Sequence, residues 1–227
     1  MTDLKRRNLS QKSEMLYDLH NFGVILDTRE IFLCSSQEYD YESAMIDHIA
    51  ANNFIRNLTT LNNIGEEPIL IRMITCGGDW NYGMAIYDAI KASKSETIVL
   101  AYAHARSMSS IIPQAATYRV IMPNADFLMH WGEWGFEGNH TSAMAEADWA
   151  RAMEGVMMDC YLDRCLDVDF WQSKWKNNHR AHAEKYLRDL LDRKQEVYFT
   201  AREAVDMGFM DAVLGDEGYE TVDVLRG

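Results

Sequence analysis

Two side chains occupy positions from which they could perform nucleophilic chemistry, and each lies at or after an apolar segment. Ser107 follows the apolar run 97–103 and precedes a helix-forming stretch, so its hydroxyl could face a cleft beside free backbone N–H groups. His130 lies near the end of the mainly apolar run 126–131, and a neutral imidazole can accept a hydroxyl proton near pH 7. Taken singly, Ser107 also fits a helix N-cap and His130 a buried core histidine, so both interpretations stay open.

A glycine pair, Gly77-Gly78, ends an earlier apolar segment and precedes a helical pattern. Glycine has no Cβ, so a backbone amide at such a position can come close to a developing oxyanion. A tight turn between strand and helix is an equally simple explanation for the same two residues.

The histidines and cysteines give little support for a metal centre or a disulfide framework. The histidines other than His130 (His20, His48, His104, His140, His179 and His182) form no HExxH-type arrangement. The four cysteines (Cys34, Cys76, Cys160 and Cys165) form no CxxC pair. We therefore expect reduced thiols and no metal, and we interpret Cys76, which lacks a local base, as a turn residue.

The segments that must position these residues alternate between strand-like and helix-like patterns. Short apolar runs predict strands at 30–33, 69–74, 97–103, 119–122 and 126–131. Helical spacing or composition predicts helices over 42–58, 82–93 and 142–166, with another helix opening at 106–110, while 167–182 stays unassigned. Alternation of this kind predicts a mainly parallel α/β sheet.

Composition limits the class of protein. The 227 residues are 48% apolar and carry a net charge of −13, so the chain can bury a substantial core but does not suit a general nucleic-acid binder. The basic residues Lys5, Arg6, Arg7 and Lys12 are interpreted as part of a solvated tail. No apolar run approaches the roughly 18 residues of a membrane helix, and no secretory signal is visible, so we expect no membrane contact and a cytoplasmic location.

Four segments together resemble the proteolytic subunit of the Clp protease. Residues 77–88 (GGDWNYGMAIYD) resemble the family pattern GG-x-V-x-x-G-x-A-I-Y-D, and 105–108 (ARSM) resemble its nucleophile turn A-A-S-M. Residues 122–130 resemble the family's Leu-Pro-Asn and Met-Ile-His, and 198–211 resemble its F-x-S-A-x-E-A-x-x-Y-G-L-x-D ending. The four segments occur in the family's order, and the resemblance covers roughly residues 30–214.

The resemblance implies an α/β fold of the crotonase-like (ClpP-like) type, built from repeated βαβ units with a protruding handle region. It implies a serine endopeptidase with Ser107 as nucleophile, His130 as base and Asp192 as the orienting carboxylate. Asp192 follows from counting back from the C-terminal motif; it lies 62 residues after His130, and Asp189 is its nearest competitor. The amides of Gly78 and Met108 would form the oxyanion hole.

The resemblance also implies an organisation and partners. Residues 1–29 would be an N-terminal extension, 30–215 the protease domain and 216–227 a C-terminal tail. Subunits of this family form homo-oligomeric stacked rings, and an ATP-driven AAA+ unfoldase feeds unfolded polypeptides to them. Residues 136–139 and the following helix occupy the position of the handle through which the rings meet. No cofactor and no nucleic acid are expected.

Several residues depart from the family pattern and keep other functions open. Cys76 replaces a proline, Arg106 an alanine and Ser109 a glycine, while Trp131-Gly132 replaces Gln-Pro. Arg106 and Trp131 would put bulk beside the nucleophile and the base. The alternatives are a catalytically inactive ring subunit and a crotonase-type acyl-CoA enzyme, which uses paired backbone amides but does not need this Ser, His and Asp set.

Overall fold

An eight-stranded sheet organises the chain, and the computed structural model describes residues 9–34, 45–133, 135, 137–175 and 177–226. Its strands are β1 Val24–Ile25, β2 Glu30–Cys34, β3 Ile69–Thr75, β4 Thr97–Arg106, β5 Tyr118–Ile121, β6 Asp126–His130, β7 Glu196–Thr200 and β8 Ala212–Val213. The main order is β1-β2-β3-β4-β5-β8, parallel except for β1. The predicted mainly parallel α/β sheet is confirmed.

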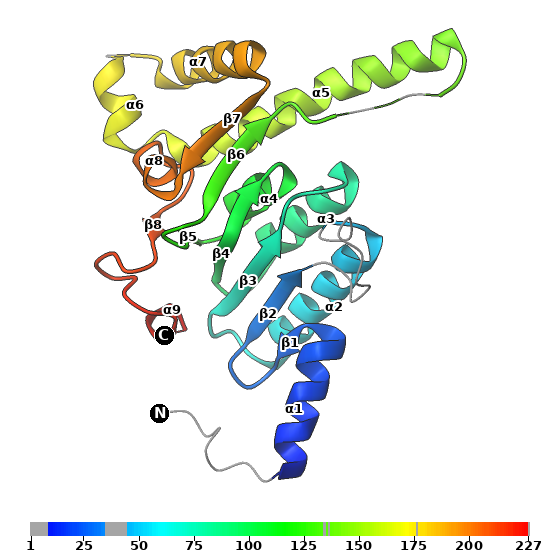
Figure 1. The fold of residues 1–227 in the computed structure, drawn as a ribbon, viewed down its shortest axis with the longest axis vertical. Helices are drawn as coiled ribbons and strands as arrows, with labels where there is room; N and C mark the ends of the chain where they lie inside the picture. The colour runs from blue at the N-terminus through cyan, green and yellow to red at the C-terminus, as the bar shows by residue number, and fades with distance from the viewer. Residues whose placement is uncertain (1–8, 35–44, 134, 136, 176, 227) are drawn as a thin grey trace.

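Strand β4 divides the sheet because its two halves pair with different neighbours. Residues 98–101 pair in parallel with β5, and residues 104–106 pair in parallel with β6. Strand β6 then pairs with β7 in antiparallel orientation. The C-terminal ends of β4 and β6 therefore lie together, separate from the β5 and β8 edge (Figure 1).

Helices surround the sheet, and several of them start after a side chain that caps the first turn. They are α1 Leu9–Phe22, α2 His48–Ile64, α3 Trp80–Lys91, α4 Met108–Ile111, the 3₁₀ turn η2 Ile112–Ala115, α5 His140–Cys165, α6 Asp169–Lys174, α7 His179–Lys194, α8 Ala201–Asp206 and α9 Val222–Leu225. Asp47 caps α2 by accepting from Ala50 N, and Asp79 caps α3 by accepting from Tyr82 N. Helix α3 therefore begins two residues before the predicted position, and α2 extends to Ile64 rather than ending at Leu58.

Both faces of the sheet are buried, but to different extents. Alternate residues of β3 and β4, such as Ile71 and Val99, enter the main core beneath α2, α3 and η2. At the far end of that core the Phe127 ring stacks on Phe209 at 5.3 Å between centroids and meets Tyr161 edge-on at 6.2 Å. Each such buried side chain contributes about 1.5–3 kcal/mol through loss of exposed apolar area.

The second face of the sheet is covered by the C-terminal end of the chain. Leu70, Leu100 and Val120 form a smaller cluster with Leu225 of α9. The adjacent Arg226 guanidinium pairs at 2.7 Å with the carboxylate of Glu30, which is almost fully buried. The proposed boundaries at residues 30 and 215 stay a prediction, and the tail beyond 215 packs on the sheet.

Helix α5 is packed along only part of its length. Its buried residues lie between Met157 and Cys165, whereas Met144 and Trp149 in its first half are exposed. Figure 1 shows this first half projecting beyond the layers of the sheet and helices. The helix has the protruding form expected of a handle; Trp134 and Phe136, which precede it, lie outside the described residues.

The segment that the sequence pattern left unassigned forms α6 and the beginning of α7. Trp171 is fully buried and donates its Nε1–H to Met207 O at 2.8 Å. Its ring stacks on Trp175 at 5.9 Å between centroids, and Trp175 stacks in turn on His182. Contacts between aromatic rings hold residues 167–182 in place. Because these contacts do not depend on a regular spacing of apolar residues, the sequence pattern did not reveal the helices.

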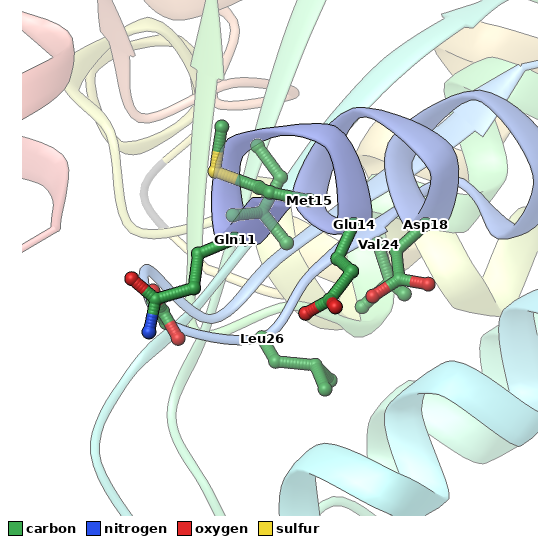
Figure 2. Close-up of a pocket in the computed structure, with 8 residues that line it drawn as sticks. Gln11, Glu14, Met15, Asp18, Val24 and Leu26 are labelled. Atoms are coloured by element: carbon green, nitrogen blue, oxygen red, sulfur yellow. The ribbon is translucent and has the colours of Figure 1, made fainter. Parts of the chain in front are cut away.

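The N-terminal helix α1 packs beside β1 and encloses a small pocket. Figure 2 shows this pocket, of about 260 Å³, lined by Gln11, Glu14, Met15, Asp18, Val24, Ile25, Leu26 and Asp27. None of its lining residues belongs to the predicted catalytic set. In the predicted basic tail, Lys12 is an exposed residue of α1, and Lys5, Arg6 and Arg7 lie outside the described residues.

Candidate active site

Ser107 occupies a strained turn between β4 and α4. Its backbone has φ 53° and ψ −129°, and its N–H donates to Leu128 O at 3.1 Å, which ties the turn to β6. A non-glycine residue with such dihedrals typically costs about 1–3 kcal/mol and is found preferentially at functional sites. Ser107 occupies the N-cap position of α4, but its side chain makes no capping hydrogen bond.

The imidazole of His130 meets the Ser107 hydroxyl. Its Nε2 lies 2.7 Å from Ser107 Oγ. The parallel pairing of β4 with β6 produces this contact, because Arg106 is aligned with Leu128 and both strands end at the same edge. A hydroxyl and a ring nitrogen at this distance can exchange a proton during nucleophilic attack.

The glycine pair lies directly against the nucleophile turn. A Cβ at Gly77, where φ is 112°, would lie 2.7 Å from Ser107 Cβ and 3.1 Å from Met108 N. A Cβ at Gly78, where φ is 144°, would overlap the backbone N and O of Ile46. Both positions therefore require glycine. The glycine pair forms a tight turn, and at Gly77 its backbone also lies close to Ser107.

Backbone pairing orients the amides expected to form the oxyanion hole. Ile46 N donates to Gly77 O at 2.6 Å, and Asp79 N donates to Ile46 O at 2.9 Å. In an extended segment successive residues turn their polar groups to opposite sides, so the N–H of Gly78 points away from Ile46. Met108 is the first residue of α4, where a helix N–H has no intrahelical acceptor.

Buried hydroxyls support the nucleophile turn from behind. Ser110 Oγ lies 2.6 Å from Ser107 O and 2.6 Å from the hydroxyl of Tyr161. Burial raises the pKa of Tyr161, so its hydroxyl stays protonated at neutral pH. The sequence analysis missed Tyr161 because it lies on α5, far from the motif, and nothing in its local pattern distinguishes it from a core aromatic.

The charge of Arg106 is neutralised beside the site. Arg106 Nε donates to Asp126 Oδ1 at 2.7 Å, and the guanidinium lies 5.4 Å from the Tyr198 ring centroid. The hydrogen bond between them raises the pKa of Arg106 and lowers the pKa of Asp126. Burial, followed by the nearby Arg106, lowers the pKa of His104. This chain has Arg106 where the family pattern has alanine. The difference thus adds an ion pair with Asp126 rather than a free positive charge.

Asp192 lies near the site but is engaged by another residue. It is exposed on the last turn of α7, and its Oδ1 accepts from Trp131 Nε1 at 2.9 Å. Its competitor Asp189 pairs with Lys185 at 3.3 Å. Among the described residues, the one hydrogen bond recorded for the His130 ring is that to Ser107. The structure brings Ser107 and His130 together beside Gly78 and Met108, and the role of Asp192 stays a prediction.

Glu196 is a further carboxylate near the site that the sequence analysis did not consider. It is the first residue of β7 and is aligned with His130 across the β6–β7 pair. Residues 196–200 alternate between exposed and buried, as in a half-buried strand. The cross-strand alignment was not visible, because 66 residues separate the two positions.

Within the described parts of the chain, no group of three or more His, Cys, Asp or Glu side chains is arranged to hold a metal ion. Cys34, Cys160 and Cys165 are free thiols, and burial raises the pKa of Cys165 to about 12. Of the helices that the structure describes, none combines the length and apolar character needed to cross a membrane.

Together, the fold and the site define an α/β protein. Its candidate active site combines a serine in a strained turn, a histidine that contacts the serine hydroxyl, and the backbone of a glycine pair. A model of the Clp protease family matches residues 11–217, and the chain belongs to this family. Its fold is the ClpP-like α/β fold, as the resemblance implied.

Curated relatives agree with the family assignment. The chain is 26% identical over 206 residues to the ATP-dependent Clp protease proteolytic subunit of Deinococcus radiodurans, covering 89% of this chain and 87% of the relative. It is also 26% identical over 171 residues to proteolytic subunit 2 of Tropheryma whipplei, covering 74% and 86% respectively. The subunit from Chlorella vulgaris is 26% identical over 214 residues, covering 93% and 92%.

Proposed function

We propose that this chain is a serine endopeptidase that cleaves peptides and unfolded polypeptides inside an oligomeric ring chamber. The observation that carries the proposal is the 2.7 Å contact between Ser107 Oγ and His130 Nε2, at a turn whose backbone is strained. Such a pair activates a hydroxyl that is otherwise a weak nucleophile.

In the proposed reaction Ser107 Oγ attacks the scissile carbonyl while His130 Nε2 accepts the hydroxyl proton. The amides of Gly78 and Met108 hold the resulting oxyanion, and each such donor is typically worth about 3 kcal/mol of barrier. The C–N bond then breaks as His130 returns the proton to the leaving amine. Water, deprotonated in turn by His130, hydrolyses the acyl-enzyme and restores the serine.

The two alternatives lack this support. A catalytically inactive ring subunit would not need Ser107 in a strained conformation with its hydroxyl against an imidazole. An acyl-CoA enzyme of the crotonase type would use the paired amides but not the serine and histidine. The ion pair of Arg106 with Asp126 also removes one reason for suspecting inactivity, since it leaves no unpaired charge beside the nucleophile.

The direct test is reaction with a fluorophosphonate followed by peptide mapping. We expect covalent modification at Ser107, because the probe requires a serine activated by a base and an oxyanion site. Labelling should disappear in His130→Ala and after denaturation, which are the two controls. An intact protein that is not labelled, or that is labelled only at another serine, would contradict the proposal.

We further propose homo-oligomeric rings and an ATP-driven AAA+ unfoldase as partner, in a cytoplasmic setting. The relatives are named subunits of an ATP-dependent protease, and the 227 residues contain no Gly-x-x-x-x-Gly-Lys phosphate loop. The projecting half of α5, with Met144 and Trp149 exposed, offers apolar surface for contact between rings. These features support an assembly that receives both energy and unfolded chains from a partner.

This assembly predicts a restricted substrate range. Purified protein should cleave short peptides but leave a stably folded protein intact, because an enclosed site admits only extended chains. Adding a matched unfoldase with ATP should start degradation of the folded protein, and omitting ATP is the control. Native mass spectrometry of the same samples reports the assembly. Efficient degradation of the folded protein by a monomer alone would contradict the enclosed chamber.

A further inference from the structure

We propose that Ser110 and Tyr161 are positioning residues that orient the Met108 N–H toward the oxyanion. The proposal rests on the serine peptidase function proposed above and deepens it, because it names the side chains that set the geometry of that same site. Neither side chain lies in the four segments that resemble the family pattern.

The first support is a chain of hydrogen bonds that ends on the carbonyl of the nucleophile. Ser110 Oγ donates to Ser107 O at 2.6 Å and lies 2.6 Å from the Tyr161 hydroxyl. The single hydroxyl hydrogen of Ser110 is used for Ser107 O, so Tyr161 is the donor in the second hydrogen bond. Hydrogen bonds in such a chain polarise and strengthen one another. The Ser107 carbonyl therefore accepts from a hydroxyl that a buried tyrosine polarises.

The backbone adds a further donor to the same carbonyl. Ser110 N donates to Ser107 O at 2.9 Å, so the N–H and the hydroxyl of one residue hold this oxygen together. The peptide between Ser107 and Met108 is planar and trans, so its C=O and N–H point in opposite directions. Fixing Ser107 O on one side therefore fixes the direction of the Met108 N–H on the other side, where the oxyanion is proposed to bind.

The backbone conformation of Ser107 explains why this peptide needs to be held. Its φ of 53° and ψ of −129° form a combination that residues with a side chain rarely adopt. Such a conformation persists only when the surrounding structure holds it in place. Relaxation of ψ at Ser107 would rotate the following peptide and turn the Met108 N–H away. The two hydrogen bonds from Ser110 oppose that rotation.

The two supporting side chains are themselves fixed. Ser110 and Tyr161 are almost fully buried. The Tyr161 ring packs edge-on against Phe127 at 6.2 Å and against Phe209 at 5.8 Å between centroids. Gln114 Nε2 donates to Ser110 O at 2.9 Å and so anchors the backbone of Ser110. The pair is therefore a rigid support, as a preorganised oxyanion site requires.

The test measures kcat and KM for peptide hydrolysis in Ser110→Ala, Tyr161→Phe and the double variant, together with the affinity for a peptide aldehyde. The serine hydroxyl adds to the aldehyde carbon, and the resulting oxyanion needs the oxyanion site, whereas the matching peptide alcohol does not. We expect Ser110→Ala to lower kcat about 10-fold with little change in KM, less than the 10²–10³-fold loss on removing a donor outright. Affinity for the aldehyde should fall by the same factor, and affinity for the alcohol should not change.

Stability measurements separate positioning from a structural role. Ser110→Ala leaves the Tyr161 hydroxyl buried without this partner, which should lower the urea unfolding midpoint. The double variant removes both hydroxyls, so it should regain much of the midpoint while kcat stays as low as in Ser110→Ala. The acid limb of the kcat profile should keep its position in all three variants, because His130 is unchanged. Recovery of kcat together with the midpoint in the double variant would overturn the positioning role.

Tyr87→Phe is the matched control. Tyr87 is also a buried tyrosine, but its hydroxyl interacts with the Cys160 side chain, so kcat and aldehyde affinity should equal those of the wild type. Fluorophosphonate labelling distinguishes the two proposals. A wild type that turns over and is labelled at Ser107, with Ser110→Ala unchanged in kcat and aldehyde affinity, would overturn the positioning role alone. A wild type with neither turnover nor labelling would overturn the proposed function and this role with it.

Discussion

Replacing Ser107 with alanine is expected to lower peptide hydrolysis by at least ~10⁴-fold, and His130→Ala should lower it to a similar extent. The two losses should be alike because the hydroxyl and the imidazole act as a unit across their 2.7 Å contact. The double variant should then be little worse than either single one. Steady-state hydrolysis of a fluorogenic peptide, with burst kinetics on the wild type, provides the measurement.

Ser109→Ala is the matched control for this loss. Ser109 is buried two residues from the nucleophile, and its Oγ has no hydrogen-bond partner in the described structure. Removing an unpaired buried hydroxyl is nearly neutral or stabilising. Circular dichroism and native mass spectrometry should show the same fold and assembly in all variants. Retained hydrolysis in Ser107→Ala would assign the nucleophile to another residue.

Gly78→Ala is expected to damage both stability and catalysis. An alanine Cβ would overlap the backbone of Ile46, and the φ of 144° is a conformation that L-residues rarely adopt. We expect a loss of about 2–4 kcal/mol in the free energy of unfolding as the chain shifts away from Ile46. The same shift withdraws an oxyanion donor, which by itself lowers kcat about 10²–10³-fold.

Gly155→Ala provides the comparison for Gly78→Ala. Gly155 lies within α5, and an added Cβ there meets nothing within 4 Å. Alanine should stabilise that helix by up to about 1 kcal/mol. Urea unfolding midpoints and kcat, measured on both variants, separate strain at one glycine from a general effect of the substitution. Equal midpoints and equal kcat for Gly78→Ala and wild type would contradict the proposed backbone role.

The strands and the central pair of the site follow from local features of the sequence. Apolar runs placed β2, β3, β5 and β6 to within one residue at either end, and β4 extended three residues farther. The contact between Ser107 and His130 follows from two parallel strands that end at one edge. Asp79 also marked the start of α3, because an aspartate is a typical N-cap residue. The prediction of that helix relied on apolar periodicity alone and therefore began it two residues late.

Other features depend on contacts between distant segments. Helices α6 and α7 are held by a cluster around Trp171, and such aromatic contacts follow no helical period. The antiparallel register of β6 with β7 aligns His130 with Glu196, whereas the role of Asp192, selected by counting along the chain, stays a prediction. Register depends on the pairing of whole strands, so it could not be derived from the residues near either position.

The groups proposed to bind the oxyanion are main-chain amides, those of Gly78 and Met108. They therefore persist when the side chains around them change during evolution. A side-chain substitution cannot delete a peptide N–H, except by proline, which lacks one. Arg106, Ser109 and Trp131 surround the site with unusual side chains, yet the turn of Ser107 still lies against Gly77. Tolerance to substitution should therefore be high at these side chains and low at the two glycines and at Ser107. Saturation mutagenesis of residues 76–78 and 106–109 would map directly where the family pattern is free to vary.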